Sequence, residues 1–450
     1  MRRKTALIVA SILMVLGIFL TGCDSSKSST TSDVTTVTVG FNSGEFSKEQ
    51  VDKFNKDHTD IKIKLIDISA AGKLQSLLAS GNAPDIIRIY AASQLPSYIN
   101  KGIAMNLQSY FDKSDAFSTG DFLPAADEFR YDSKTKLQGT GDLYGFVKDW
   151  SQDFTLWYNK KIFDQNNIPY PSPTEPMTWD DVYRLGKRMT VVEGGKVKQY
   201  GLGFYNSNMQ ANVDMLTLQA AQQGKSLWSD DFTTANFEDP AVKTLLQQYV
   251  DLVKANVGNN TINQDANFAG NTFNENKMAM FISGYWYSGM LRGAKKNPKD
   301  LETYGYAPAP VVAGGTRMDP TGAATGGIIF SGTKHVDAAW KVFEYLFGGS
   351  PADDRAKSGW GIPGFKSKME LMPQETAWDK EVLGIAKNEL DYASPFLKYN
   401  PYLELTAVNT IIDKYMVPVY YGRDTLDNAA KQINQALNQA IQSGMQQAGK

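Results

Sequence analysis

The sequence predicts an α/β fold with more than one domain, and three observations support this prediction. Between residues 35 and 90, β-branched runs alternate with amphipathic runs, which is typical of parallel strands joined by helices. Helical patterns dominate much of the chain beyond residue 178. The chain has 450 residues, 42% of them hydrophobic, which is enough for two or more hydrophobic cores.

The first five elements follow a strand and helix alternation. Ser47 and Gln50 have the spacing of a capping box, so a helix is expected to begin there. The residues around it include two runs with the β-branched or alternating character of strands. The predicted order is strand, helix, strand, helix, strand, at residues 35–41, 46–58, 61–68, 72–81 and 84–90. This order implies parallel pairing of the strands.

Later elements are marked by caps, prolines and glycines. Thr178 follows a proline-rich loop and precedes Asp181 by three residues, which predicts the start of a helix. Strands are expected within 144–163 and at 324–333, where glycines flank an apolar run. Further helices are predicted at 95–102, 213–223, 240–256, 271–284 and 337–349, and through most of 383–441.

Composition excludes several classes of protein. The formal net charge of −2 lacks the basic excess of a nucleic-acid-binding protein. One cysteine and two histidines, His58 and His335, cannot build a Cys/His metal cluster or an internal disulfide. A site made only of carboxylates is not excluded by these counts. We expect no cofactor and no metal.

The N-terminus has the layout of an export signal. Arg2, Arg3 and Lys4 precede an uncharged run to Leu20, which is short for a membrane span. Leu20-Thr21-Gly22-Cys23 resembles the bacterial lipobox, and a Ser/Thr-rich stretch follows it. The resemblance implies a signal peptide at 1–22, a lipidated Cys23 that anchors the protein to the cell membrane, and a flexible linker at 23–34. The alternative is an anchor that is never cleaved.

The mature chain resembles the extracellular solute-binding proteins of ABC importers, in the family that includes maltose-binding proteins. The motifs that carry the resemblance occur in one order along most of the chain: LLASGNAPDII, SYINKGIAMNL, LWYNKKIFDQNNIPYP, TWDDVYRLGKRMT, FNENKMAMFISGYW, YAPAPV, DAAWKVFEYL and GWGIPG. The resemblance implies two α/β lobes with a ligand cleft between them. The expected division is 35–149 with 311–365 for lobe 1, and 150–310 with 366–450 for the helix-rich lobe 2.

The same resemblance implies the function. The protein would be an extracytoplasmic monomer that closes around a sugar or oligosaccharide by hinge motion and delivers it to the membrane permease of an ABC transporter. Nucleic acid is not an expected partner, and no catalytic residue is expected. A lipid-anchored glycoside hydrolase, a binder of another solute and an adhesive lipoprotein are the alternatives. The hydrolase would use a pair among Glu45, Asp149 and Asp153.

Candidate ligand-binding residues follow from the positions that match the family. Aromatic rings can cover the apolar faces of a pyranose, and Asp, Glu, Gln and Asn can bind its hydroxyl groups. The family's carboxylates after the PD strand are replaced here by Ala91, Ala92 and Ser93. Core packing is the competing interpretation for Trp150 and Trp286. The candidates are Asn42, Ser43, Glu45, Tyr90, Ser93, Asp149, Trp150, Gln152, Asp153, Tyr285, Trp286, Gly326, Gly327 and Trp360.

Overall fold

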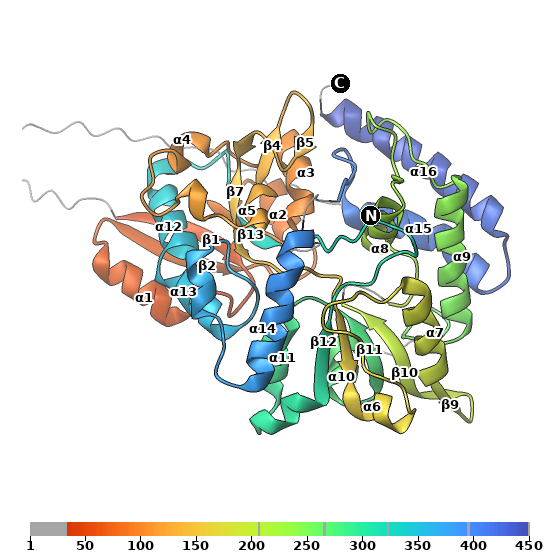
Figure 1. Cartoon of the computed structure of the whole chain (residues 1–450). Coiled ribbons are helices and arrows are strands. Elements are labelled where there is room, and N and C mark those ends of the chain that lie inside the picture. The colour runs from red at the N-terminus through yellow and green to blue at the C-terminus, as the bar shows by residue number, and fades with distance from the viewer. Residues whose placement is uncertain (1–33, 206–207, 264–266, 322–323, 394–396, 449–450) are drawn as a thin grey trace, which may run out of the picture.

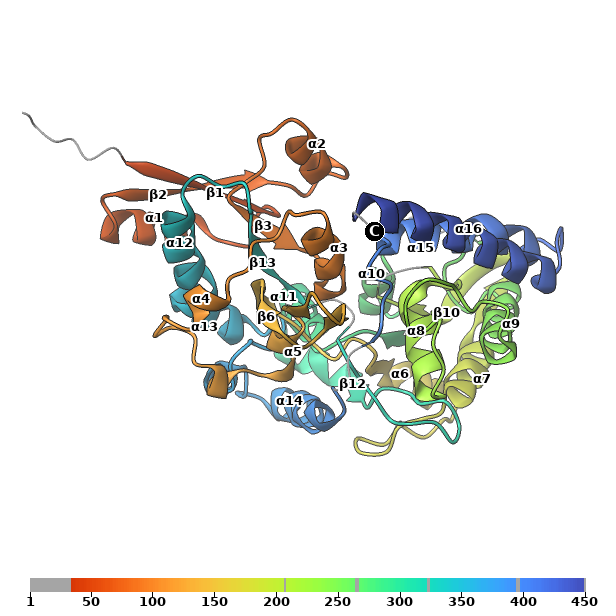
Figure 2. The same cartoon turned by 90° about the horizontal axis from the view of Figure 1, so that it is seen from above.

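The computed structural model describes residues 34–205, 208–263, 267–321, 324–393 and 397–448. The predicted signal segment, Cys23 and nearly all of the predicted linker lie outside these residues. The described chain forms two lobes that lie side by side (Figures 1 and 2). Each lobe is built on a five-stranded sheet flanked by helices, so the predicted two-lobed α/β fold is confirmed.

The first sheet has the strand order β2-β1-β3-β13-β7. β1 pairs in parallel with β2 and β3, as the sequence predicted, and β13 pairs antiparallel with β3 and β7. β13 follows all five strands of the second sheet in the sequence, so the first sheet is completed only after the chain has returned from lobe 2. The strands are β1 (Thr35–Phe41), β2 (Ile61–Asp67), β3 (Ile86–Ile89), β7 (Gly145–Asp149) and β13 (Thr325–Ile329).

Helices and a small sheet surround this first sheet. The predicted capping box is present, because Ser47 accepts from the Gln50 N–H and the Gln50 side chain accepts from the Ser47 N–H. A small antiparallel sheet of β4 (Arg130–Asp132), β5 (Leu137–Gln138) and β6 (Asp142–Leu143) lies in the same lobe. The helices are α1 (Lys48–Asp57), α2 (Lys73–Ala79), α3 (Leu95–Asn100), α4 (Gln108–Phe111), α5 (Pro124–Asp127), α12 (Val336–Gly348) and α13 (Ser350–Ser358).

The second sheet has the order β12-β8-β11-β10-β9. Its central strand β11 (Met278–Ile282) corrects the prediction of a helix over 271–284, where the helix α10 ends at Asn274. All five residues of β11 are buried, so the strand carries no apolar and polar alternation. The other strands are β8 (Leu156–Asn159), β9 (Val191–Glu193), β10 (Lys196–Phe204) and β12 (Tyr304–Ala307).

Long helices make lobe 2 helix-rich. The predicted helix start at Thr178 is confirmed, since its side chain accepts from the Asp181 N–H. Helices α9, α15 and α16 pack together on the outer side of this lobe (Figure 2). The helices are α6 (Lys160–Gln165), α7 (Trp179–Met189), α8 (Val213–Gln222), α9 (Pro240–Lys254), α10 (Ala269–Asn274), α11 (Tyr287–Ala294), α14 (Ala377–Glu389), α15 (Leu405–Tyr420) and α16 (Leu426–Gln447).

The chain passes between the two sheets at least twice. It leaves the first sheet at Asp149 and enters the second at Leu156, and it returns between Ala307 and Thr325. The lobe boundaries predicted at 149/150 and 310/311 fall at or within these connections. The full assignment of residues to lobes stays a prediction.

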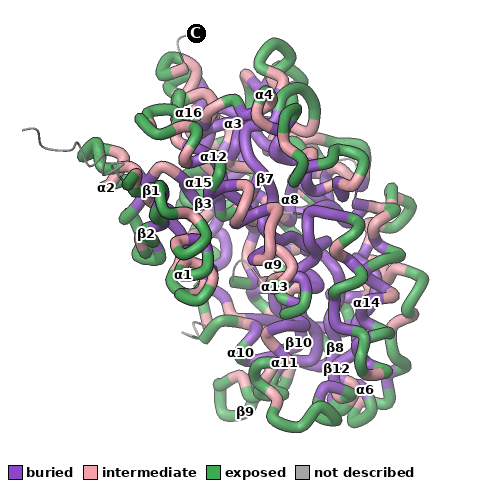
Figure 3. The backbone as a smooth tube through the Cα atoms, turned by 90° about the vertical axis from the view of Figure 1, so that its left-hand side faces the viewer, coloured by how far each residue is buried: buried purple, intermediate pink, exposed green. Residues whose placement is uncertain are grey.

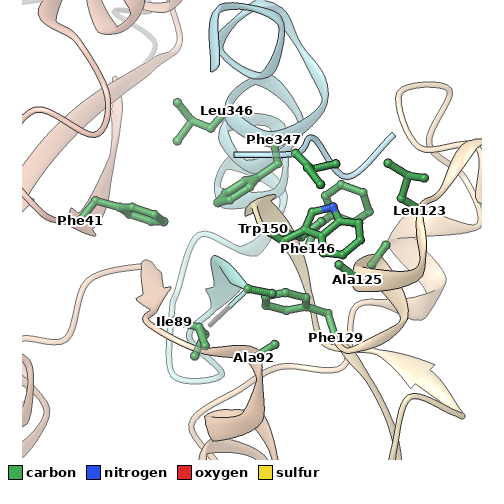
Figure 4. Close-up of a cluster of buried hydrophobic side chains, with 14 of the residues drawn as sticks. Phe41, Ile89, Ala92, Leu123, Ala125, Phe129, Phe146, Trp150, Leu346 and Phe347 are labelled. Atoms are coloured by element: carbon green, nitrogen blue, oxygen red, sulfur yellow. The ribbon is translucent and has the colours of Figure 1, made fainter. Parts of the chain in front are cut away.

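Aromatic side chains fill the core of lobe 1. Phe146 on β7 contacts Phe117, Phe122 and Phe365 with ring centroids 4.8 to 4.9 Å apart. The close-up in Figure 4 shows Trp150 beside Phe146 in this cluster. Strands β3, β7, β8, β11 and β12 are buried along their whole length, whereas the edge strand β9, the outer helices and the loops carry exposed residues (Figure 3). Among the described residues, no helix is both long and apolar enough to cross a membrane.

Candidate binding site

A cavity of about 620 Å³ opens between the two lobes, within the usual size range of small-molecule sites. Lobe 1 contributes the loop after β1, strand β3 and the end of β7, while Tyr205 and Trp286 follow β10 and β11 of lobe 2. The cavity therefore lies where several strands end, as ligand sites do in open α/β sheets. Its lining is Asn42, Ser43, Gly44, Glu45, Arg88, Asp149, Trp150, Ser151, Asp153, Tyr205, Trp286, Thr325, Arg355 and Trp360.

The structure brings most of the predicted residues to this cavity. They come from four separate parts of the sequence, and the family resemblance, rather than any local pattern, predicted that they share one cleft. Their contact with a ligand stays a prediction. The predicted residues in the lining are Asn42, Ser43, Glu45, Asp149, Trp150, Asp153, Trp286 and Trp360.

Four other predicted residues lie outside the lining. Tyr90 is adjacent to it, because its hydroxyl donates to Asn42 Oδ1 at 2.6 Å. Gln152 and Tyr285 are fully buried, and Gln152 donates to the Ala386 carbonyl at 3.0 Å. The hydroxyl of Ser93 is also buried. Gln152 and Tyr285 therefore lie in the interior of the protein, whereas Ser93 is partly buried with its hydroxyl shielded from solvent.

Gly326 and Gly327 pack inside strand β13 and do not line the cavity. A Cβ at Gly326 would lie 2.3 Å from both the Phe129 ring and the Phe146 carbonyl oxygen. A Cβ at Gly327 would lie 2.4 Å from the Phe347 ring. The absence of a side chain at these positions lets the sheet pack closely against large aromatic rings.

Six lining residues were not predicted from the sequence, and one of them carries a recognisable signal. Arg88 is the single charge in the strand IIRI, whose four residues are all buried, and a charge in such a strand needs a partner. Arg355 lies on α13 among other charged residues, so its pattern does not separate it from them. The missed residues are Gly44, Arg88, Ser151, Tyr205, Thr325 and Arg355.

Buried charges form a connected network on the lobe 1 wall, which we call the charge network: Glu45, Arg88, Lys148, Asp149 and Arg355. Glu45 lies 2.6 Å from Arg88 Nε and 3.0 Å from Lys148 Nζ. Asp149 lies 2.6 Å from Lys148 Nζ and 2.8 Å from Arg355 Nε. Lys148, 6% exposed, therefore bridges the two carboxylates.

The cations keep both carboxylates of the charge network ionised. Burial alone would raise the pKa of Glu45, but Lys148 and Arg88 outweigh it and hold that pKa below its ordinary value. Burial also opposes ionisation of Asp149, yet Arg355 and Lys148 lower its pKa far below the usual range. Burial lowers the pKa of Lys148 despite the attraction of Asp149. Glu45 and Asp149 therefore carry negative charge at neutral pH.

Aromatic side chains line the cavity with different degrees of exposure. Trp360 is 38% exposed, whereas Trp150 is only 2% exposed and donates its indole N–H to the Pro363 carbonyl at 2.9 Å. Trp286 is partly buried, and its ring lies 6.5 Å from that of Tyr205. Trp286 and Trp360 are thus the rings best able to cover a sugar face, while Trp150 belongs mainly to the core.

Close backbone contact joins the lobe connection to lobe 2 below the cavity. The N–H of Trp286 donates to Ser151 Oγ at 3.1 Å. A Cβ at Gly284 would lie 2.6 Å from Ser151 Cβ and 2.8 Å from Asp153 Oδ1. Gly284 therefore permits the approach that fixes Trp286 over the connection.

No group of three or more His, Cys, Asp or Glu residues within the described ranges is arranged to hold a metal ion. The carboxylates of Glu45 and Asp149 are instead occupied by the cations of the charge network.

Two α/β lobes with a polar, aromatic-lined cavity between them define a two-lobed binding protein. The family model of the bacterial extracellular solute-binding protein matches residues 40–348, which is more than half of the chain. The chain therefore belongs to this family of binding proteins.

Solved structures share the whole fold. An ABC substrate-binding protein from Listeria monocytogenes, in complex with cycloalternan, has a TM-score of 0.74 and 22% identity over 91% of this chain and 100% of its own. The maltose/maltodextrin-binding domain from Bdellovibrio bacteriovorus, bound to maltotriose, has a TM-score of 0.68 and 21% identity over the same shares. A solute-binding protein from Thermotoga lettingae, bound with α-D-tagatose, has a TM-score of 0.69 and 20% identity, again over 91% and 100%.

Curated relatives match a shorter part. Putative binding proteins of Brucella abortus and Brucella suis are 23% identical over 193 residues, which is 43% of this chain and 44% of each relative. The alignment thus spans less than half the length of these relatives.

Proposed function

We propose that this protein is the extracytoplasmic substrate-binding component of an ABC importer and that it binds a sugar or oligosaccharide in the cavity between its lobes. The observation that carries the proposal is the combination of two accessible indole rings, Trp286 and Trp360, with fixed polar groups in one cavity between two lobes. Rings and fixed hydrogen-bonding groups together suit the apolar faces and the hydroxyl rim of a pyranose. Several structures of the same fold hold saccharides.

The state of two of the three candidate carboxylates favours binding over hydrolysis. A glycoside hydrolase needs a carboxylic acid that is protonated near its working pH. Glu45 and Asp149 are instead held as carboxylates by neighbouring cations. We therefore propose capture without chemical change, by lobe closure around the ligand.

A saccharide panel tests this function directly. The purified protein is titrated with neutral and acidic mono- and oligosaccharides by calorimetry, and each mixture is then analysed for cleavage products. We expect at least one saccharide to bind and to be recovered intact. Product formation would reassign the protein to the hydrolases, and failure of every saccharide to bind would overturn the sugar proposal.

Localisation and partners form the remaining part of the proposal. Lipidation of Cys23 would keep the protein at the cell membrane, where it would act as a monomer that presents its ligand to permease subunits. Two or more acyl chains are needed for stable anchoring. Metabolic labelling with a palmitate analogue tests this step: the wild-type protein should be labelled, and Cys23→Ser should not be.

A further inference from the structure

The carboxylates on the lobe 1 wall of the cavity are already engaged by donors of the protein. Glu45 Oε2 accepts from Arg88 Nε at 2.6 Å and from the Asn42 N–H at 3.0 Å, and Oε1 lies 3.0 Å from Lys148 Nζ. Asp149 Oδ1 accepts from Thr325 Oγ1 at 2.8 Å. Asp149 Oδ2 lies between Lys148 and Arg355. All four oxygens thus have at least one partner, which reduces their remaining capacity to accept from a ligand.

Two arginines in the same wall keep their terminal nitrogens unused. Arg88 Nε donates to Glu45 at 2.6 Å, and Arg355 Nε lies 2.8 Å from Asp149 Oδ2 as an ion pair without hydrogen-bond geometry. No hydrogen bond joins the Nη1 or Nη2 atom of either arginine to another described residue, and Arg88 Nη1 is buried without a partner. A buried donor without an acceptor is costly. The unused edge of each guanidinium is the planar pair of donors that matches a carboxylate.

The orientation of Arg88 is fixed before any ligand arrives. Arg88 is 7% exposed, and its Cζ lies 4.0 Å from the centre of the Tyr90 ring. The Tyr90 hydroxyl is in turn bonded to Asn42. Because the ring and Glu45 hold the guanidinium from two sides, little side-chain entropy remains to be lost on binding.

The charge balance on this wall favours a negative ligand group. Three cations of the charge network share two carboxylates, which leaves one positive charge in excess. The third carboxylate of the lining, Asp153, lies on the connection between the lobes, where its Oδ2 accepts from Thr321 at 3.1 Å. A ligand anion is therefore attracted to the lobe 1 wall and repelled from the connection.

We propose that the ligand is an acidic sugar, a uronic acid or an oligosaccharide that contains one, whose carboxylate binds the terminal nitrogens of Arg88 and Arg355. This inference rests on the proposed sugar-binding function and specifies its substrate class. In it, Glu45 and Asp149 are positioning residues that hold the two guanidinium groups, and Trp286 and Trp360 cover the sugar ring.

Matched pairs of saccharides test the inference by calorimetry. The probes are glucuronate and glucose, galacturonate and galactose, α-1,4-trigalacturonate and α-1,4-galactotriose, and β-1,4-trimannuronate and β-1,4-mannotriose. We expect at least one acidic member to bind about tenfold or more tightly than its neutral partner, since hydrogen bonds to charged groups are the stronger ones. The preference should weaken as salt is added.

Variants assign the preference to the arginines. Arg88→Gln and Arg355→Gln should each reduce the acidic preference to within about twofold of unity while changing the affinity for the neutral partner much less. Arg130→Gln is the matched control, because Arg130 pairs with Asp127 at 2.9 Å and is not in the lining. Thermal melting of each variant verifies that it is folded. Because two variants are used, the test still works if one of them does not fold.

The outcomes separate this inference from the proposed function. Three results would overturn the acidic ligand but leave the sugar-binding function standing. The first is tighter binding of the neutral member in every pair that binds, and the second is equal binding within every pair. The third is an equal loss of affinity for both members of a pair in Arg88→Gln. If no saccharide binds at all, both proposals fail.

Discussion

At the scale of single residues, Lys148 links both halves of the charge network. Its Nζ lies 3.0 Å from Glu45 and 2.6 Å from Asp149, and all three groups are largely removed from solvent. Removing one member of a buried ion pair leaves the charge of its partner buried without compensation. This usually lowers the free energy of unfolding more than replacing the whole pair by apolar side chains.

We expect Lys148→Met to lower the free energy of unfolding by about 3 kcal/mol at neutral pH, measured by urea denaturation. The control is Lys48→Met, whose exposed pair with Asp52 should contribute less than about 1 kcal/mol. A Lys148→Met effect no larger than that of Lys48→Met would contradict the role given to the network.

The same network gives stability a defined dependence on pH. The folded pKa values of Glu45 and Asp149 lie below their ordinary values, so their contribution is present in full above the unfolded pKa values of about 4. It is lost as the pH falls through the folded values. Urea titrations from pH 7 to pH 3 should therefore show the gap between wild type and Lys148→Met narrowing below about pH 4. A gap that is constant over this range would exclude the linkage.

For Trp286, ligand binding and core packing predict opposite effects of a substitution. Its ring is partly buried at the cavity, so Trp286→Ala should weaken saccharide binding by up to a few kcal/mol and leave the melting temperature nearly unchanged. Tyr170→Ala is a suitable control, since Tyr170 is 46% exposed and lies outside the cavity. A large loss of stability with unchanged affinity would reassign Trp286 to the core.

How far single residues could be predicted depended on the kind of signal they carry. Matching motifs pointed to Asn42, Asp149 and Trp286, which lie in the lining of the cavity, and their contact with a ligand stays a prediction. The ion partners of Glu45 were not predictable, because Arg88 and Lys148 lie 43 and 103 positions away in the sequence, and no local pattern relates such distant residues.

At the scale of elements, the glycine pair Gly326 and Gly327 has a packing role in strand β13, although it matches a binding motif of the family. Gly326→Ala should destabilise the protein by about 3 kcal/mol or more, because the new methyl group would meet the Phe146 carbonyl and the Phe129 ring. Gly293→Ala in α11 is the matched control, as its Cβ would meet nothing within 4 Å and alanine favours helix. Thermal melts decide between them, and equal melting temperatures for the two variants would refute the packing role.

Local signals predicted elements well where they were present. The capping box at Ser47, the cap at Thr178 and the β-branched run of β1 all gave correct elements. The strand β11 was predicted as helix because its sequence, MAMFI, is apolar at every position, as suits a strand that is buried on both faces. A short run that is apolar throughout has no period, so flanking tertiary contacts decide its conformation.

At the scale of the whole molecule, the two lobes and the cavity between them followed from the family resemblance rather than from any periodicity. Strand patterns indicated an α/β fold, but they could not show that β13 returns to the first sheet after the second is complete. That return brings Thr325, Arg355 and Trp360 to the same cavity as Trp286 and Tyr205. The site therefore depends on the strand order, which brings together residues that are far apart in the sequence.

The direction of β1 has a practical consequence. Its last residues lead into the loop 42–45 at the cavity, and its seven residues extend for roughly 20 Å. The first residue of β1 therefore lies on the side of lobe 1 that is far from the opening of the cavity. A fluorophore, affinity handle or surface attachment placed ahead of Val34 would leave the entrance unobstructed, so immobilised preparations should retain access for cargo.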